Sequence, residues 1–331
     1  MNKIRLGIIG SGGICEFHMP ALKAAGFELT AVGSRRGSER VHSFAQKHQI
    51  PCIFEDSEDL LKARGQWDAL LIAVSVEPTL EILKRAIEAR VPILVEKPVT
   101  FHSEELKPWL HQNLPVMVGY NRRYYRTVQQ ARKEVKLGSF LMGRLNLPES
   151  IRVPAQPIDN PLYLKSFFSN SVHGLDMMRF IFGNIQVKYV HRLTDSNGAI
   201  HGIAATFSSQ KENLIQFTAH WQAPDNFSLT LDRVGRRFEL RPFESASVFE
   251  GMEVVDPTPE IPVRTYRPKM VEKIDLEEHD KRFKPGFFLQ AQAFAAMVRG
   301  ENPKDAARLE DAYAALVLAE QLAGKYLDSR I

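Results

Sequence analysis

The chain has 331 residues, which is long enough for two domains with ordinary hydrophobic cores. Its composition, 44% hydrophobic and 25% charged residues, is that of a globular protein and excludes a disordered or fibrous chain. The formal net charge of +4 is small for this length, and the sequence carries no basic stripe of the kind that binds nucleic acid.

Cysteine content and the N-terminal sequence indicate which cellular compartment to expect for the protein. The two cysteines, Cys15 and Cys52, cannot build a disulfide framework, and no Cys/His cluster has the spacing of a zinc site. The N-terminus shows no signal-peptide pattern, and no apolar run approaches the ~20 residues of a membrane span. We therefore expect a soluble, cytoplasmic protein without a metal and without a membrane or nucleic-acid partner.

Strand-like and helix-like segments alternate over the first 118 residues. The strands are mostly continuous apolar runs, as expected where helices cover both faces of a parallel sheet. This order predicts an α/β domain of the doubly wound Rossmann type over residues 1–121. The predicted strands are 4–9, 28–34, 52–54, 69–75, 92–95 and 115–118, and the predicted helices are 15–25, 38–49, 57–64, 78–90 and 103–112.

The pattern changes after residue 122. Turn residues separate several strand-like runs between residues 185 and 268, which favours an antiparallel or mixed sheet. We therefore predict a second, α+β domain over residues 122–331. Its predicted helices are 123–138, 171–182, 286–299 and 308–326, its strands are 185–193, 202–208, 213–221, 227–234 and 237–240, and residues 144–160 read as a loop.

A glycine-rich segment from Gly10 to Cys15 follows the first predicted strand and opens the first predicted helix. Gly10 permits a tight turn, Gly12 lets the backbone approach a pyrophosphate, and the helix N-terminus presents free N–H groups to it. Cys15 stands where the dinucleotide-binding fingerprint has Gly or Ala, and it is small enough for close packing. An ordinary glycine turn is the alternative, but the strand before and the helix after favour a dinucleotide loop.

The end of the second predicted strand distinguishes NAD from NADP. NAD sites usually place Asp or Glu there to bind the ribose 2′-hydroxyl. This chain has Ser34-Arg35-Arg36, and two arginines can pair with a 2′-phosphate. NADP is therefore favoured over NAD, the alternative being that both arginines only solvate a loop.

Two further motifs follow the fifth and sixth predicted strands: Val95-Glu96-Lys97-Pro98-Val99 and Val118-Gly119-Tyr120-Asn121-Arg122-Arg123. Together with the glycine loop and with Val172-His173-Gly174-Leu175-Asp176, the chain resembles the Gfo/Idh/MocA oxidoreductases over nearly its whole length. The resemblance implies a large, mostly antiparallel open sheet in the second domain that often mediates dimers. It also implies hydride transfer to or from a hydroxyl-bearing carbon of a sugar, polyol or related compound.

The same resemblance suggests roles for individual side chains. Lys97 would contact the reacting hydroxyl, where an ammonium stabilises developing alkoxide charge or relays a proton. His173 has a side chain suited to proton exchange at neutral pH, although a lone buried histidine is more often a packed one. Asp176 shares its helix face and would bind substrate or only solvate the helix. Glu96 would orient the site, and His18 is expected only to pack.

One position departs from the family pattern. Many members carry an Asp four residues before the central histidine, and this chain has Ser169 there. Serine cannot hold a charge that polarises the histidine. This keeps open a silent NAD(P)-binding regulatory protein, and a third alternative is an NAD-dependent glycosidase-type enzyme.

The basic and aromatic cluster that begins at Asn121 would suit an acidic or nucleotide-linked sugar, since Arg binds carboxylates and phosphates and Tyr stacks on sugars. A solvated start of a helix is the alternative. A homo-oligomer, dimer or tetramer, is expected from the family resemblance alone. The predicted cofactor residues are Gly10, Gly12, Gly13, Ile14, Ser34, Arg35, Arg36, Val74, Pro78, Glu96 and Lys97, and the predicted substrate residues are Asn121, Arg122, Tyr124, Ser169 and Asp176, beside the catalytic pair Lys97 and His173.

Overall fold

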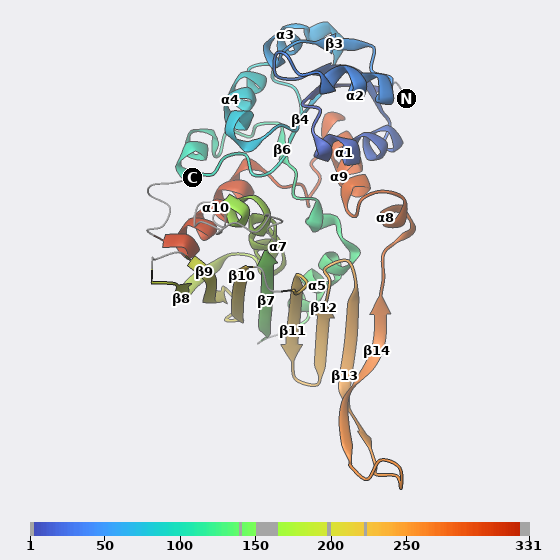
Figure 1. Cartoon of the computed structure of the whole chain (residues 1–331), viewed down its shortest axis with the longest axis vertical. Helices are drawn as coiled ribbons and strands as arrows, with labels where there is room; N and C mark the ends of the chain where they lie inside the picture. The colour runs from blue at the N-terminus through green and yellow to red at the C-terminus, as the bar shows by residue number, and fades with distance from the viewer. Residues whose placement is uncertain (1–2, 139–140, 150–164, 197–199, 222–223, 325–331) are drawn as a thin grey trace. The chain divides into compact units, whose positions relative to one another are not determined.

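A computed structural model describes residues 3–138, 141–149, 165–196, 200–221 and 224–324 of the chain. Contacts divide the chain into two compact units (Figure 1). The first unit consists of residues 1–124 and 278–317, and the second consists of residues 125–277 and 318–331. The division into a cofactor domain and a substrate domain at residue 121 remains a prediction.

A six-stranded sheet forms the centre of the first unit, with the strand order β3-β2-β1-β4-β5-β6. All of its strand pairs are parallel, which confirms the predicted doubly wound sheet. The strand order reverses between β1 and β4, and ligands bind at the carboxyl ends of strands beside such a point. The strands are β1 (Ile4–Ile9), β2 (Phe27–Gly33), β3 (Cys52–Phe54), β4 (Ala69–Ile72), β5 (Ile93–Val95) and β6 (Val116–Val118).

Helices pack around this sheet. The predicted helical segment 103–112 is helical over Ser103–Trp109, where it forms the 3₁₀ helix η2. Pro108 lies inside it, and proline lacks the N–H donor that an α-helix needs at that position. The helices that occur in this unit are α1 (Gly13–Ala24), α2 (Arg40–His48), α3 (Ser57–Lys62), η1 (Arg64–Gln66), α4 (Val76–Ile87), η2, η3 (Asn121–Tyr124), α8 (Glu278–Arg282), α9 (Phe287–Val298) and the first part of α10 (Leu309–Ala323).

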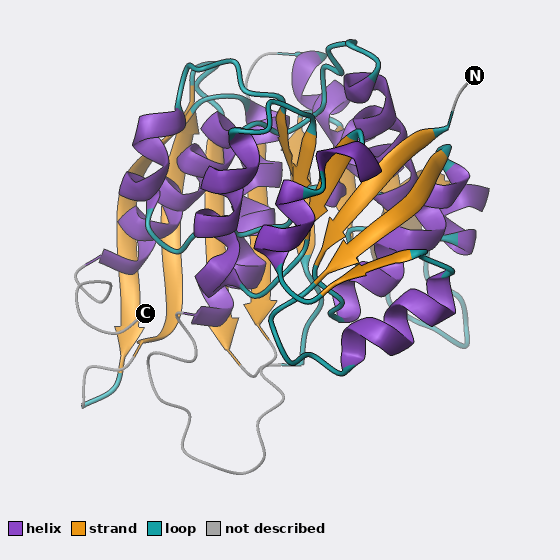
Figure 2. Ribbon diagram, turned by 90° about the horizontal axis from the view of Figure 1, so that it is seen from above, coloured by secondary structure: helices purple, strands orange, loops and turns teal. Residues whose placement is uncertain are grey.

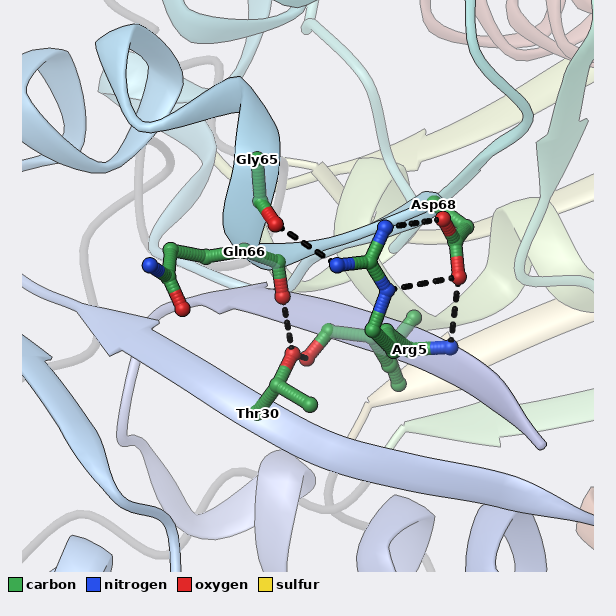
Figure 3. A network of polar contacts seen from close by, with 6 residues as sticks. Arg5, Thr30, Gly65, Gln66 and Asp68 are labelled. Carbon is green, nitrogen blue, oxygen red and sulfur yellow. Dashed lines mark hydrogen bonds and ion pairs between the residues drawn. The ribbon is translucent and has the colours of Figure 1, made fainter.

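Hydrogen bonds link the segment around η1 to strands β1 and β2 (Figure 3). Arg5 of β1 donates from its backbone N, Nε and Nη2 to the Asp68 carboxylate at 3.0, 3.1 and 2.6 Å, and its Nη1 donates to Gly65 O at 2.6 Å. Thr30 Oγ1 of β2 donates to Gln66 O at 2.6 Å. The hydrogen bonds from Arg5 hold the pKa of Asp68 below its ordinary value, although partial burial opposes the shift.

The second unit contains an eight-stranded sheet in the order β14-β13-β12-β11-β7-β10-β9-β8. Of the neighbouring strand pairs in this sheet, only β7 and β10 are parallel and the other pairs are antiparallel. The prediction of a mostly antiparallel sheet is therefore confirmed. Its strands are β7 (Met142–Glu149), β8 (Ile185–Thr194), β9 (Ile200–Ser209), β10 (Leu214–Trp221), β11 (Ser228–Arg233), β12 (Arg236–Leu240), β13 (Ala246–Val255) and β14 (Thr265–Ile274).

Strand β7 corrects the predicted loop over residues 144–160, of which residues 150–160 lie outside the described part of the chain. Gly143, Leu145 and Leu147 are buried, whereas Arg144 and Asn146 between them remain half-buried. This alternation is that of a strand with one covered face. Asn146 and Pro148, which are common in turns, obscured it in the sequence.

Helices cover one face of this sheet: α5 (Arg126–Lys136), the π-helical turn η4 (Phe167–Ser171) and α7 (Val172–Phe182) (Figure 2). A Cβ built on Gly174 of α7 would lie 2.7 Å from Leu147 Cδ1 of β7. The glycine therefore allows the helix to approach the sheet at the turn that carries His173 and Asp176.

We predict that Asp68→Asn lowers the free energy of unfolding at pH 7 by about 0.5–1 kcal/mol, the range for an exposed pair with good geometry. Because the folded-state pKa of Asp68 is lowered, its contribution is present above the unfolded pKa of about 3.9 and is lost as the pH falls through the folded value. Urea unfolding at pH 7 and pH 3 tests this. Asp59→Asn, in an exposed i,i+3 pair with Lys62, is the control. Equal losses for Asp68→Asn at both pH values would contradict the assignment.

Candidate functional site

A cavity of about 960 Å³ opens at the carboxyl edge of the six-stranded sheet. Segments that follow β1, β2 and β4 line it, together with the first turns of α2 and α4. Most predicted cofactor residues lie here, and Glu96 and Lys97 do not line it. The predicted residues that do so are Gly10, Gly12, Gly13, Ile14, Ser34, Arg35, Val74 and Pro78.

The glycine loop has the conformation that the sequence required. Gly10 has a φ of +116°, and a Cβ there would lie 2.2 Å from Ala73 O, so no other residue fits. A Cβ at Gly12 or Gly13 would meet nothing within 4 Å, which leaves room for a ligand against the backbone. Helix α1 begins at Gly13 without a side-chain cap, so its first N–H groups remain available for a phosphate.

Cys15 performs the packing role expected of the third fingerprint position. Its side chain is fully buried, and Sγ lies 3.5 Å from Ala73 O. Burial raises the pKa of its thiol to about 12, so the group stays protonated and serves packing rather than chemistry.

The arginines after β2 have different positions. Arg35 lines the cavity beside Ser34, whereas Arg36 does not line it and donates to Asp56 Oδ2 at 2.8 Å with 75% of its side chain exposed. Arg40 and Glu39, near the start of α2, also line the cavity, and sequence reasoning missed both. The sequence contained the information needed to find them, because the first residues of the helix after β2 lie at the same edge of the sheet as the glycine loop.

Glu96, which directly follows β5, is a buried carboxylate with fixed partners. His18 Nε2 lies 2.6 Å from Glu96 Oε1, and the Lys97 backbone N–H donates to Glu96 Oε2 at 3.1 Å. A Cβ on Gly119 would lie 3.2 Å from this carboxyl group, so the glycine after β6 makes room for it. Burial alone raises the pKa of Glu96, but His18, the Lys97 charge and the Lys97 N–H outweigh it and hold the pKa below its usual range.

The expectation that His18 only packs was wrong. Its ring also lies against Phe287 of α9, with centroids 4.7 Å apart, so it joins α1, α9 and the turn after β5. Lys97 itself is half-buried, and its bond to Pro98 is cis.

The predicted substrate residues of the first unit lie in η3 (Asn121–Tyr124). Asn121 is buried and its Nδ2 donates to Pro285 O at 2.9 Å, while Tyr124 belongs to the hydrophobic core. Arg122 is half-buried. The buried Arg123 pairs with Asp311 at 2.9 Å. Asn121 and Arg123 therefore hold the α8–α9 segment and α10 in place, whatever else they bind.

The remaining predicted residues share one helical stretch of the second unit. Ser169 lies in the π-helical turn η4, and His173 and Asp176 follow in α7. His173 and Asp176 are buried, at 8% and 1% exposure. Wide turns of this kind occur frequently at functional sites. The sequence missed Glu149, a buried carboxylate that accepts a hydrogen bond from Ser171 Oγ at 2.6 Å.

The first unit is thus a parallel-sheet nucleotide-binding fold with a glycine-loop cavity, and the second carries a large open sheet. Residues 4–112 match the family model described as "Oxidoreductase family, NAD-binding Rossmann fold". These residues of the chain are therefore similar to the NAD-binding part of the Gfo/Idh/MocA oxidoreductases. No helix in the described part of the chain has the length and apolar character needed to cross a membrane.

Individual relatives agree with the family. The chain is 28% identical over 194 residues to the "Uncharacterized oxidoreductase YrbE" of Bacillus subtilis (strain 168), which covers 55% of each chain. It is 25% identical over 193 residues to an inositol 2-dehydrogenase of Rhizobium meliloti (strain 1021), covering 54% of this chain and 55% of that one. The alignments therefore span about half the length of these curated relatives.

Among solved structures, UDP-N-acetylglucosamine 3-dehydrogenase GnnA from Acidithiobacillus ferrooxidans superposes with a TM-score of 0.71 at 18% identity. The match covers 97% of both chains. At this identity the likeness shows the shared fold.

We predict that Glu96→Gln lowers the free energy of unfolding at pH 7 by about 1–3 kcal/mol, because it removes a buried charge-assisted hydrogen bond. The folded-state pKa of Glu96 is lowered, so its contribution is present above the unfolded value of about 4.3 and is lost as the pH falls through the folded value. Wild type should therefore lose stability with acid more steeply than the variant. Urea unfolding from pH 7 to pH 3 checks this, with Glu104→Gln, in an exposed pair with Lys107, as the control. Parallel stability curves for wild type and Glu96→Gln would argue against a charged, paired Glu96.

Proposed function

We propose that the chain is an NAD(P)-dependent dehydrogenase or reductase that transfers a hydride to or from a hydroxyl-bearing carbon of a sugar, polyol or nucleotide-linked sugar. The observation that carries the proposal is the glycine-loop cavity, at the same carboxyl edge of the sheet that carries the Glu96-Lys97 turn after β5. The names of its relatives, an inositol dehydrogenase and a UDP-N-acetylglucosamine dehydrogenase, agree with this substrate class.

The cavity fits a dinucleotide. The open space over Gly12 and Gly13 and the uncapped start of α1 would receive the pyrophosphate, and the residues after β2 would receive the adenosine ribose. Val74 and Pro78 supply an apolar wall. When bound, the nicotinamide supplies or accepts the hydride.

Lys97 and His173 are the proposed catalytic groups. An ammonium at Lys97 stabilises negative charge on the reacting oxygen, and the Glu96 carboxylate fixes its backbone through the Lys97 N–H. His173 would exchange the hydroxyl proton, and Asp176, on the same helix, would bind substrate. Ser169, four residues before His173, provides a hydroxyl but no charge.

We propose NADP as the preferred cofactor, with NAD as the alternative. Arg35 and Arg40 line the cavity and offer two guanidinium groups to a 2′-phosphate. Glu39 also lines it and is the carboxylate that would suit the free 2′-hydroxyl of NAD. Arg36, which does not line the cavity, has the weaker claim to a cofactor contact.

Titration of the purified protein with NADPH and NADH, followed by tryptophan fluorescence, tests both parts. We predict tighter binding of NADPH and a loss of about tenfold to hundredfold in NADPH affinity for Arg35→Ala or Arg40→Ala, the range for one charged hydrogen bond. NADH affinity should change little. Arg36→Ala, which is outside the cavity, is the matched control.

Tighter NADH binding in wild type would overturn the NADP preference and leave the oxidoreductase proposal in place. If neither dinucleotide binds, the proposed function fails. A screen of sugars, polyols and nucleotide sugars by nicotinamide absorbance then separates an enzyme from a silent NAD(P)-binding regulator. The regulator is the alternative that Ser169, in place of an Asp, favours. A glycosidase-type enzyme would cleave a glycosidic bond with no net change in that absorbance.

We also propose a homo-oligomer in a reducing compartment such as the cytoplasm, where Cys15 and Cys52, both free, would stay reduced. The β13–β14 hairpin of the second unit extends beyond the other strands of its sheet (Figure 1). Met252 pairs with Pro268 and Val254 pairs with Tyr266, so these four side chains share one face of the hairpin. Met252, Val254 and Tyr266 are 51–63% exposed.

The other face of the hairpin is the more polar one, since three of its four side chains, Glu253, Arg267 and Thr265, are polar and Val255 is the fourth. A strand pattern with one apolar and one polar face is that of a half-buried ribbon, and a two-stranded ribbon on its own is marginal in water. The same face of a second copy, formed by Met252, Val254, Tyr266 and Pro268, is uncharged and would cover this apolar face of the hairpin.

We predict that wild type has a mass above the 37.6 kDa of one chain by light scattering and sedimentation. Val254→Glu should shift dissociation to a concentration at least about tenfold higher, because it places a charge on the apolar face. Val255→Glu, the adjacent residue on the polar face, should not. A single-chain mass for wild type at all concentrations, or equal effects of the two variants, would reject this surface.

A further inference from the structure

A second, smaller cavity of about 340 Å³ adjoins the glycine-loop cavity of the first unit. The glycine loop and the first turn of α1 form one wall of this small cavity, and helix α2 forms the other. Ser11, Gly12, Gly13 and Arg40 line both cavities, so the two meet at the glycine loop. A ligand in the glycine-loop cavity can therefore extend one of its groups into the small cavity.

Two side chains where the cavities meet carry unused hydrogen-bond donors. Ser11 is 6% exposed, and within the described residues its hydroxyl forms no hydrogen bond. Arg40 is exposed, and in the same part of the chain its guanidinium forms no ion pair or hydrogen bond. Leaving a buried hydroxyl without a partner is costly. A ligand with oxygen acceptors would supply the partner that both side chains lack.

The small cavity also contains an ion pair between its two helices. Lys47 Nζ of α2 lies 2.7 Å from Glu16 Oε2 of α1, and His48 Nε2 lies 3.0 Å from the same oxygen. The hydrogen bond from Lys47, and to a smaller extent the one from His48, holds the pKa of Glu16 below its usual value, although partial burial opposes the shift. Glu16 is therefore ionised at neutral pH, and the ammonium of Lys47 compensates its charge.

The charges around the small cavity favour an anion. The charged residues that line it are Arg40, Lys47 and Glu16, so the compensated Glu16–Lys47 pair leaves the charge of Arg40 in excess. The neighbouring carboxylate of Glu39 lines the glycine-loop cavity but not the small one. A concave site with excess positive charge attracts anions, and a phosphate accepts strong hydrogen bonds from a guanidinium.

We propose that the small cavity receives the 2′-phosphate of NADP(H), bound by Ser11 and Arg40, and that the Glu16–Lys47 pair is the specificity-determining element that sets how tightly this phosphate is held. The inference rests on the proposed function and deepens its cofactor preference. The segment after β2, where the adenosine ribose would lie, leads to Arg40, which both cavities share. The neutral 2′-hydroxyl of NAD would leave Arg40 without an anion.

The experiment compares ligands that differ by the 2′-phosphate alone. Adenosine 2′,5′-bisphosphate is compared with AMP, and NADPH with NADH, by calorimetry at low ionic strength, where surface charges are least screened. The variants are Ser11→Ala, Lys47→Met, Glu16→Gln and the double variant that combines the last two. The control is Lys62→Met, which removes an exposed lysine that lies 3.8 Å from Asp59 and lines neither cavity.

We expect each 2′-phosphate ligand to bind wild type at least about tenfold tighter than its partner, the effect of one hydrogen bond to a charged group. Ser11→Ala should reduce this affinity ratio by about tenfold. Lys47→Met should lower it by up to about fivefold, because the Glu16 carboxylate then repels the phosphate, and Glu16→Gln should raise it by a similar factor. The double variant should return close to wild type, and Lys62→Met should not change the ratio.

The opposite signs of the two single variants separate this role from a structural one. If the Glu16–Lys47 pair only held α1 against α2, both variants would change the ratio in the same direction, and that result would overturn the proposal. An unchanged ratio in Ser11→Ala would do so as well.

The wild-type protein distinguishes failure of this inference from failure of the proposed function. Binding of both dinucleotides without a gain from the 2′-phosphate would remove this inference and the NADP preference, and the oxidoreductase proposal would remain. Absence of dinucleotide binding is the separate result that removes all of them.

Discussion

A carboxylate buried at the end of a β-strand needs partners, and the partners of Glu96 organise the first unit. His18 brings α1 to it, the Lys97 N–H fixes the turn after β5, and Gly119 leaves the space it occupies after β6. Each partner comes from a different segment of the Rossmann topology. Burial raises the pKa of Glu96, and His18, the Lys97 charge and the Lys97 N–H outweigh it and hold the pKa below its usual range. These contacts fix the backbone of the turn that carries Lys97.

The sequence was sufficient for the parts of the fold that local pattern determines. Apolar runs between helices predicted the parallel sheet. The glycine loop predicted the cofactor cavity, and the structure explains why Gly10 is needed there: its φ of +116° and its closeness to Ala73 O admit only glycine. Strand β7 was missed. Its turn-forming residues masked the two-residue alternation of buried and half-buried side chains.

Long-range partners could not be predicted from one sequence. His18 and Glu96 are 78 residues apart, and Asn121 and Pro285 are 164 residues apart. Only the folded chain shows that Asn121 holds the backbone at Pro285, or that Arg40 faces the cavity and Arg36 does not. The residue types were visible in the sequence, but the direction of each side chain was set by packing.

The most direct test of the account is the fate of the hydride. The protein would be incubated with NADPH carrying deuterium at C4 and with the ketone form of each candidate sugar, and the product would be analysed by NMR and mass spectrometry. We predict deuterium at a single carbinol carbon with wild type, and loss of transfer in Lys97→Met with unchanged NADPH affinity. Tight NADPH binding by wild type, with no deuterium in any product and no cleavage of a glycoside, would contradict the account and leave a protein that senses the cofactor.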